Sequence, residues 1–170
     1  MITIRQMTEA DVESVSRVVS AGYAYLAERE GYSTDQVARL QAERASVAGV
    51  RSWPSQWRCF VAEWKGGVVG VLAVDRDDVA ELWVHPAYHR RGVGTALFVK
   101  AQQSIAEQGY SALTVHCAGS SMQPFYAAMQ CTAAGTRRCS SGPLAGWLLT
   151  QYHKQLKAQH PAAPSCGRCR

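Results

Sequence analysis

The residues best suited to chemistry lie between positions 86 and 97, where an apolar run ends at a proline and a short basic loop leads into a helical pattern. The first turn of a helix leaves about four backbone N–H groups without internal partners, and the helix dipole adds positive potential. Gly92 and Gly94 have no side chains, so an anion can approach the backbone closely. Arg90 and Arg91 add guanidinium donors. The junction therefore predicts a site for a phosphate-bearing ligand.

The spacing of the glycines narrows the choice of ligand. Leu97 stands where a dinucleotide fingerprint needs its third glycine, and no Gly-Lys-Ser/Thr follows as in a nucleotide P-loop. Dinucleotides and nucleoside triphosphates are therefore disfavoured. Two structural alternatives stay open: glycines at this position also permit tight packing of a helix on a sheet, and an arginine pair also suits a solvated surface.

Hydrophobic periodicity predicts the elements that surround this junction. A short strand at residues 2–4 precedes a helix that Thr8 and Asp11 open as a capping box. Aromatic-rich segments such as 22–25 are predicted to be irregular connections. The predicted helices are 8–21, 35–47, 93–108 and 124–129, and the predicted strands are 58–64, 68–75, 79–85, 111–117, 137–140 and 146–153.

This order, β-α-α-β-β-β-α-β-α-β-β, predicts one α+β (mixed α/β) domain. Its central sheet is mixed and mostly antiparallel, with about 6–7 strands flanked by about four helices. We assign residues 1–157 to this domain. Residues 158–170 contain Pro161, Pro164 and small polar residues, which predict a flexible C-terminal tail.

Composition limits the remaining classes of function. The 170 residues carry a formal net charge of +5, but the basic residues are dispersed and no helix-turn-helix or aromatic–basic RNA motif is present, so we expect no nucleic acid partner. No apolar run is long enough for a bilayer and no secretory signal is evident, so we expect a cytoplasmic protein without a membrane partner. Its six cysteines are then expected as thiols; Cys166 and Cys169 have the spacing of half a zinc site, and we expect no metal.

Three segments together resemble one family. His89-Arg-Arg-Gly-Val-Gly94 resembles the acetyl-CoA signature [Q/R]-x-x-G-x-[G/A] of the GNAT-superfamily N-acetyltransferases. Residues 5–11 resemble the opening of that family, and residues 121–129 resemble its A-x-x-F-Y-x-x-x-G-F helix. The resemblance covers roughly residues 2–156 and includes the order of the elements.

The resemblance implies an acetyl-CoA-dependent N-acetyltransferase. Backbone amides of residues 90–95 would hold the CoA diphosphate, and the preceding strand would pair with the pantetheine arm in a splay beside strand 111–117. A backbone N–H near Leu82 or Trp83 would stabilise the oxyanion, and Tyr126 would protonate the leaving thiolate. The expected cofactor-binding residues are Leu82, Trp83, Val84, His89, Arg90, Arg91, Gly92, Val93, Gly94 and Thr95.

The proton acceptor and the fit to the family pattern are less sharply defined by the sequence. Glu81 is our candidate for the base that draws the proton from the ammonium group, with Asp78, His85 and His116 as rivals. The chain departs from the pattern in three places: His89 replaces Gln or Arg, residues 118–121 lack an asparagine for which Ser120 or Ser121 can substitute, and Gln130-Cys131 replaces Gly-Phe. Tyr126 also suits a purely structural role as a core aromatic residue.

The acceptor is expected to be a small-molecule amine or a peptide or protein amine. The segments that form the acceptor pocket in this family supply Tyr23, Tyr25, Tyr32, Trp53, Trp57 and Trp147, rings that suit an apolar or cationic acceptor as well as a packed core. A second copy of the chain is an open alternative as a partner. A catalytically degenerate member that binds CoA as a sensor or partner module is the alternative function.

Overall fold

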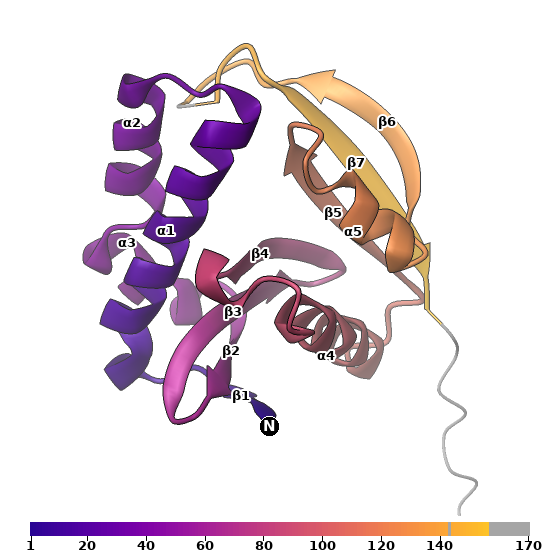
Figure 1. The fold of residues 1–170 in the computed structure, drawn as a ribbon. Helices are drawn as coiled ribbons and strands as arrows, with labels where there is room; N and C mark the ends of the chain where they lie inside the picture. Colours follow the sequence, from indigo (N-terminus) through magenta and orange to yellow (C-terminus); the bar gives the residue numbers. More distant parts are fainter. Residues whose placement is uncertain (143, 157–170) are drawn as a thin grey trace, which may run out of the picture.

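The chain forms a seven-stranded sheet with helices on both faces in the computed structural model, which describes residues 1–142 and 144–156 (Figure 1). The strands are β1 Ile2–Gln6, β2 Arg58–Trp64, β3 Gly67–Asp75, β4 Asp78–Val84, β5 Ala112–Ala118, β6 Thr132–Arg138 and β7 Leu148–Gln155. The helices are α1 Val12–Glu30, α2 Thr34–Arg44, α3 Val47–Arg51, α4 Val93–Glu107 and α5 Gln123–Ala128. The predicted order is confirmed, with α3 as an addition, and so is the α+β class. The predicted tail, 158–170, and residue 157 lie outside the described residues.

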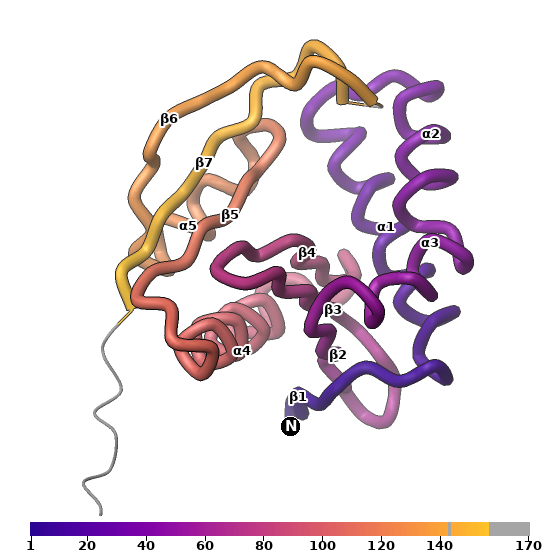
Figure 2. Tube along the Cα trace, turned by 180° about the vertical axis from the view of Figure 1, so that it is seen from behind, coloured from indigo at the N-terminus to yellow at the C-terminus, as the bar shows by residue number. Residues whose placement is uncertain are grey.

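The sheet opens between two of its strands. Its order is β1-β2-β3-β4-β5-β7-β6, and neighbours run antiparallel except for β4 and β5. These two parallel strands pair only where Asp78 and Val79 meet Thr114 and Val115. Beyond that point they separate, so the β1–β4 part and the β5–β7 part diverge as two wings, which is also visible from behind (Figure 2). The splay that the sequence analysis expected here is therefore present.

Alternating side chains on the strands build a core on each face of the sheet. In β2, Cys59 and Val61 belong to the cluster under α1, α2 and α3, whereas Phe60 and Ala62 belong to the cluster under α4. This period of two is the geometry of a strand buried on both faces. On the α4 side, Leu97 and Phe98 are fully buried. The two cores fix α1 and α4 on opposite sides of β4.

The first helix is longer than predicted, and the second is divided. Residues 22–30 are helical rather than irregular, because Tyr23 continues the buried stripe of α1 and is only 3% exposed. The helix ends at Gly31, whose φ of 72° is left-handed. The predicted helix 35–47 ends at Arg44, and α3 begins where the Gly49 N–H donates to the Ser46 hydroxyl at 3.1 Å.

The predicted first strand of the last hairpin begins too far toward the C-terminus. This strand, β6, begins at Thr132 instead of residue 137 and is exposed along its whole length. An edge strand without a buried face has no alternation of apolar and polar residues, so periodicity could not reveal it. The start of α1 is four residues later than predicted, because a 3-10 turn at Glu9–Asp11 precedes it. The other boundaries lie within one or two residues of their predictions.

Two further expectations concern membranes and thiols. Among the described residues, no helix is long and apolar enough to span a membrane. The described residues also contain four free thiols: Cys59, Cys117, Cys131 and Cys139. Cys166 and Cys169 lie outside the described residues.

Candidate active site

The edge of β4 that faces the splay carries main-chain groups available to a ligand. The His85 N–H donates to the Val69 carbonyl at 2.9 Å, and antiparallel pairing alternates from there, so Trp83 and Glu81 bond to β3. Leu82 and Val84 consequently direct their N–H and C=O groups into the splay. A β-bulge at residue 80 shifts the register against β3 just before this edge. Of the two expected oxyanion donors, the geometry favours the Leu82 N–H.

The start of α4 forms the predicted anion site. Gly92 caps the helix at φ 82°, a left-handed conformation that favours glycine. The Ala96 N–H is the first to bond within the helix, to the Gly92 carbonyl at 3.0 Å, so the N–H groups of residues 93–95 have no partner in the helix. Gly94 lies between β4 and α5, where a Cβ atom would be 3.3 Å from the Phe125 ring. The glycines thus serve tight packing and anion access together.

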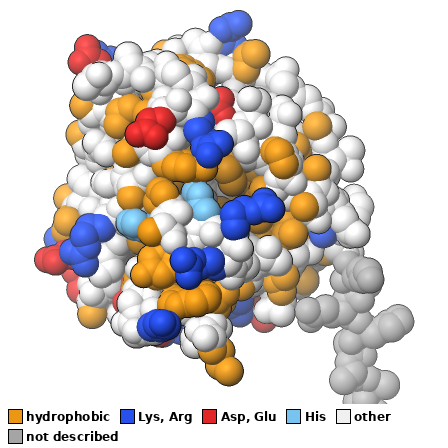
Figure 3. All heavy atoms as spheres, in the orientation of Figure 1, with side chains coloured by type: hydrophobic (Ala, Val, Ile, Leu, Met, Phe, Trp, Pro, Cys, Tyr) orange, Lys and Arg blue, Asp and Glu red, His pale blue; other side chains and the backbone are white. Residues whose placement is uncertain are grey.

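Basic residues surround this corner. Arg90 and Arg91 are exposed, and the Arg91 guanidinium lies 5.9 Å from the ring centroids of both Trp64 and Tyr88. Figure 3 shows histidine and basic side chains gathered near the centre of this face, among exposed apolar atoms. The corner therefore combines helix N–H donors with arginine forks, as an anionic group requires.

His89 is turned back toward the strand. Its Nε2 lies 3.0 Å from the Val84 carbonyl oxygen, which can only accept, so Nε2 carries a hydrogen. The edge of the Tyr25 ring packs against it at 4.8 Å between centroids. His89 therefore closes the far end of the open β4 edge, and its contact with phosphate remains a prediction.

Glu81 is a buried carboxylate with two partners. Its side chain faces α1 and is 6% exposed. The Trp83 indole N–H donates to it at 2.6 Å, and the Arg44 guanidinium lies 3.7 Å away. Burial raises the pKa of Glu81, while Arg44 and the bond from Trp83 work to lower it. A buried carboxylate whose pKa is raised in this way is a candidate proton acceptor.

The ring of Trp83 is held against α1. It packs on Tyr23 at 4.4 Å between centroids. A Cβ atom at Gly22 would lie 2.4 Å from the Trp83 ring, so only glycine leaves the room for it at this position. The Gly22 position therefore fixes the indole that bonds to Glu81.

The rival proton acceptors occupy different surroundings. His116 Nδ1 lies 3.5 Å from an Asp78 carboxylate oxygen at the point where β4 and β5 separate. Burial raises the pKa of Asp78, and the neighbouring His116 opposes that shift. His85 accepts from the Ala87 N–H at 3.2 Å and so caps the turn after β4. The geometry thus brings Asp78, Glu81 and His116 to the splay and gives His85 a local structural contact.

Tyr126 lies beneath the other wing of the splay. It is 5% exposed and stacks on Tyr152 at 5.0 Å between centroids, with Phe98 and Phe125 as edge-on neighbours. Burial, then the nearby Cys117 thiol, raises the pKa of Tyr126. The hydroxyl therefore stays protonated and remains a donor. Its packing also satisfies the structural interpretation, and its catalytic role remains a prediction.

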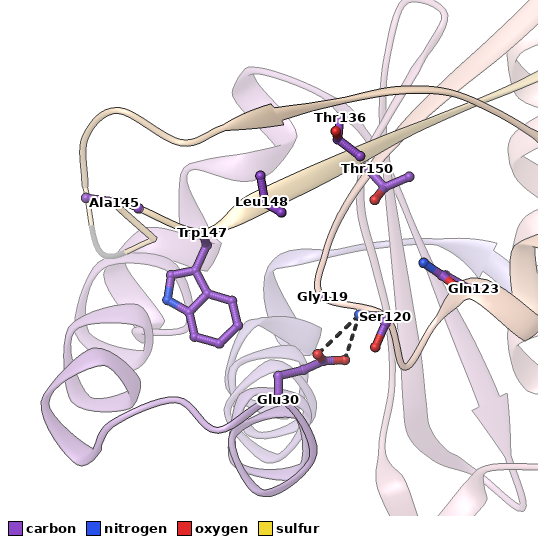
Figure 4. Close-up of a pocket in the computed structure, with 10 residues that line it drawn as sticks. Glu30, Gly119, Ser120, Gln123, Thr136, Ala145, Trp147, Leu148 and Thr150 are labelled. Carbon is purple, nitrogen blue, oxygen red and sulfur yellow. Dashed lines mark hydrogen bonds between the residues drawn. The ribbon is translucent and has the colours of Figure 1, made fainter.

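A cavity of about 640 Å³ lies at the outer end of the splay. Its walls come from the end of α1, the turn after β5, the start of α5, and β6 and β7 with the end of their connection (Figure 4). The lining residues are Glu30, Gly119, Ser120, Gln123, Thr136, Ala145, Gly146, Trp147, Leu148 and Thr150. Of the predicted aromatic wall, Trp147 lines this cavity and contacts Tyr32 edge-on at 4.0 Å between centroids.

Sequence reasoning missed three residues of this region. Arg44 lies on a separate helix from Glu81, and no local pattern joins the two residues. Gly22 lies in a segment that the sequence predicts to be an irregular connection. A lone glycine within a helical pattern, however, indicates close packing of another group against the helix. Glu30 carries no sequence signal, because its role depends on a turn 90 residues away. By contrast, Trp53 and Trp57 pack together beneath the sheet and not at this site.

The comparison with known families agrees with this geometry. The model of the acetyltransferase (GNAT) domain matches residues 55–129, which run from just before β2 through α5 and include the open β4 edge and the start of α4. This segment is therefore similar to the GNAT acetyltransferase domain. No curated protein matches the chain in sequence.

Solved structures of N-acetyltransferases share the fold of this chain. A GCN5-related N-acetyltransferase from Rhodopseudomonas palustris is 24% identical with a TM-score of 0.80, over 91% of this chain and 95% of that one. PaiA N-acetyltransferase from Thermoplasma acidophilum, in complex with coenzyme A, is 16% identical with a TM-score of 0.67, over 89% and 98%. YncA from Salmonella typhimurium, with its cofactor acetyl-CoA, is 18% identical with a TM-score of 0.68, over 98% and 99%. The GNAT fold supports acetyl transfer in general.

Proposed function

We propose that this protein transfers the acetyl group of acetyl-CoA to a primary amine. The observation that carries the proposal is the junction of β4 and α4, where an unpaired strand edge leads directly to unbonded helix N–H groups. One thioester ligand with a diphosphate needs both features: an edge for an extended arm and a site for an anion. Bound acetyl-CoA supplies an activated acetyl thioester.

Each part of the corner has a role in this proposal. The N–H groups of residues 93–95 and the side chains of Arg90 and Arg91 hold the diphosphate. The main chain of Leu82 and Val84 pairs with the arm, and the Leu82 N–H donates to the oxygen on which negative charge develops. Glu81 and Tyr126 then handle the protons. Among the described residues no three His, Cys, Asp or Glu side chains are arranged to hold a metal.

The proton balance follows from the positions of these two residues. One C–N bond forms and one C–S bond breaks. Glu81, facing α1, accepts the proton that the ammonium group must lose before its nitrogen can attack. Tyr126, on the opposite face, donates a proton to the sulfur, and the second proton, which the nitrogen sheds once the C–N bond has formed, restores the Tyr126 hydroxyl. The acid and the base thus reach the reacting groups from opposite faces of the sheet.

Calorimetric titration with acetyl-CoA tests the binding step. We expect Gly92→Glu to weaken binding roughly tenfold or more, because a carboxylate at the helix start repels phosphate and blocks the backbone. Gly109→Glu is the matched control, since Gly109 is equally left-handed at φ 89° but lies beyond the opposite end of α4. Unchanged affinity in Gly92→Glu would contradict the site.

Release of CoA thiol in the presence of amines tests the transfer step. We expect turnover with primary amines. Tight acetyl-CoA binding without thiol release for any amine would instead support the sensor or partner module. The two experiments therefore separate an enzyme from a degenerate binding protein.

A further inference from the structure

Among the described residues that line the cavity at the end of α1, Glu30 is the one charged group, and its side chain is held in place by hydrogen bonds. Both carboxylate oxygens of Glu30 accept from the Ser120 N–H at 3.1 Å (Figure 4). One of them also accepts from the Ser121 N–H at 2.6 Å. A Cβ atom at Gly119, whose φ of 87° favours glycine, would lie 2.3 Å from this carboxylate and would displace it. The turn after β5 thus presents Glu30 to the cavity in one orientation.

Glu30 stays ionised and has no cation of its own in the described part of the chain. Burial acts to raise its pKa, but the bonds from Ser121 and Ser120 lower it below the ordinary value. Its neighbour Arg29 is directed elsewhere, over the Tyr25 ring at 4.6 Å. Among the described residues, no Lys, Arg or His forms an ion pair with Glu30. A carboxylate on a cavity wall beside the Trp147 indole favours a cation.

Helix α1 carries Glu30 at its end and, along one face, also contacts the strand that bears Glu81. Tyr23, whose ring packs on Trp83, and Glu30 are seven residues apart in α1, so they lie on one face of the helix. A rise of 1.5 Å per residue separates them by about 10 Å along the axis. Leu26 lies between them on this face and is partly buried. The face therefore runs from the proposed proton acceptor, past an apolar residue, to a second carboxylate.

We propose that the acceptor is a dication: a primary amine that carries a second positive charge about 10 Å from the reacting nitrogen, held by Glu30. This inference rests on the proposed acetyl transfer and names the substrate class for the same site. Apolar spacer atoms pass Leu26, and the polar residues Ser120, Gln123, Thr136 and Thr150 line the cavity together with Glu30. A protein or peptide amine with a basic residue at that spacing belongs to the same chemical class.

Matched amines test the second charge. Diaminooctane and octylamine share a reacting nitrogen and an eight-carbon chain, and they differ only in the distal ammonium. We expect KM for diaminooctane to be about tenfold lower, the effect of one charge-assisted contact. Diaminobutane, whose second nitrogen cannot reach Glu30, should lose this advantage. Equal KM values for diaminooctane and octylamine would overturn the proposal.

Substitution of Glu30 assigns the effect to this cavity. Glu30→Gln keeps an acceptor for Ser120 and removes the charge, so KM for diaminooctane should rise about tenfold while KM for octylamine stays unchanged. Glu28→Gln, an equal change of charge at an exposed position of α1, should alter neither value. If Glu30→Gln raises both KM values equally, Glu30 serves only to hold the turn and the proposal fails.

A second variant and a binding measurement complete the test. Gly119→Ala places a methyl group against the carboxylate and should reproduce the loss for diaminooctane, whereas Gly109→Ala, equally left-handed with open space around it, should not. Calorimetric titration of diaminooctane into the protein without acetyl-CoA measures the cavity independently of catalysis. Diamine binding that depends on Glu30, in a protein that transfers no acetyl group, would refute the proposed function and leave the cation site standing. Absence of that dependence would refute the cation site.

Discussion

The indole N–H of Trp83 donates to the carboxylate of Glu81 at 2.6 Å, two residues earlier on the same strand. Both side chains face α1, because residues i and i+2 of a strand lie on one side of the sheet. Burial raises the pKa of Glu81, and Arg44, with this bond from Trp83, acts to lower it. A carboxylate balanced in this way can accept a proton and release it again.

Removal of the indole donor should change the pH dependence of catalysis. In Trp83→Phe the ionised form of Glu81 loses a charge-assisted bond, so its pKa rises. Since protonated Glu81 cannot act as a base, the acidic limb of kcat/KM against pH should move up by about one unit, with the high-pH plateau less affected. Trp57→Phe, a ring packed on Trp53 away from Glu81, is the control. A limb that stays in place would exclude Glu81 as the titrating base.

A methyl group on Gly22 should disturb the same contact from the opposite side. Its Cβ would lie 2.4 Å from the Trp83 ring, so the ring or α1 must move. Although alanine favours a helix by about 1 kcal/mol over glycine, overpacking costs about 1–3 kcal/mol. Urea unfolding of Gly22→Ala should therefore show net destabilisation. Gly22→Ala combined with Trp83→Leu should recover part of the loss, and a stabilised Gly22→Ala single variant would show that the ring has room to shift.

The order of helices and strands could be predicted from the sequence, because buried positions are occupied by apolar residues in recognisable patterns. The apolar run that contains Cys59, Phe60, Val61 and Ala62 predicted a strand, and the structure shows this strand buried on both faces. The junction at Gly92 was predicted for a similar reason, since local spacing alone creates free N–H groups there. Contacts between residues far apart in the sequence produce no such local pattern and could not be predicted.

Three particular residues show where this limit lies. Gln130 stands where the family pattern has glycine, yet it adopts φ 60° and closes α5 as a glycine would. Only the folded structure reveals that a non-glycine residue adopts this left-handed conformation. The pairing of Glu30 with Ser120 joins segments 90 residues apart, and its specificity comes from the fold and not from any motif.

Substitution of Tyr126 separates its two interpretations. Tyr126→Phe keeps the stack on Tyr152 and the apolar contacts, so stability should change little. If the hydroxyl donates to the leaving sulfur, kcat should fall roughly 100-fold, the usual contribution of a general acid, with little change in KM. Tyr152→Phe removes the neighbouring hydroxyl and is the control. Equal thiol release by Tyr126→Phe and the unmodified protein would leave Tyr126 as a core residue.

The stability of the fold should depend on the ion pair that joins β1 to the start of α1. Two nitrogens of Arg5 each donate to an Asp11 oxygen at 2.7 Å, and the Asp11 side chain is 7% exposed. The bond from Arg5 lowers the Asp11 pKa from 3.8 to about 2. A depressed pKa of this size corresponds to about 2 kcal/mol, present above the ordinary pKa and lost as the pH falls toward about 2.

Urea unfolding of Asp11→Asn at several pH values measures this contribution. We expect a loss of about 2 kcal/mol at neutral pH, with the difference from the unmodified protein shrinking as the pH falls from about 4 to about 2, because protonation removes the Asp11 charge in both cases. Glu13→Gln, 78% exposed on the same helix, should change stability by less than about 0.5 kcal/mol throughout. A difference that stays constant down to low pH would show that Asp11 acts through the capping bonds from Thr8 rather than through its charge.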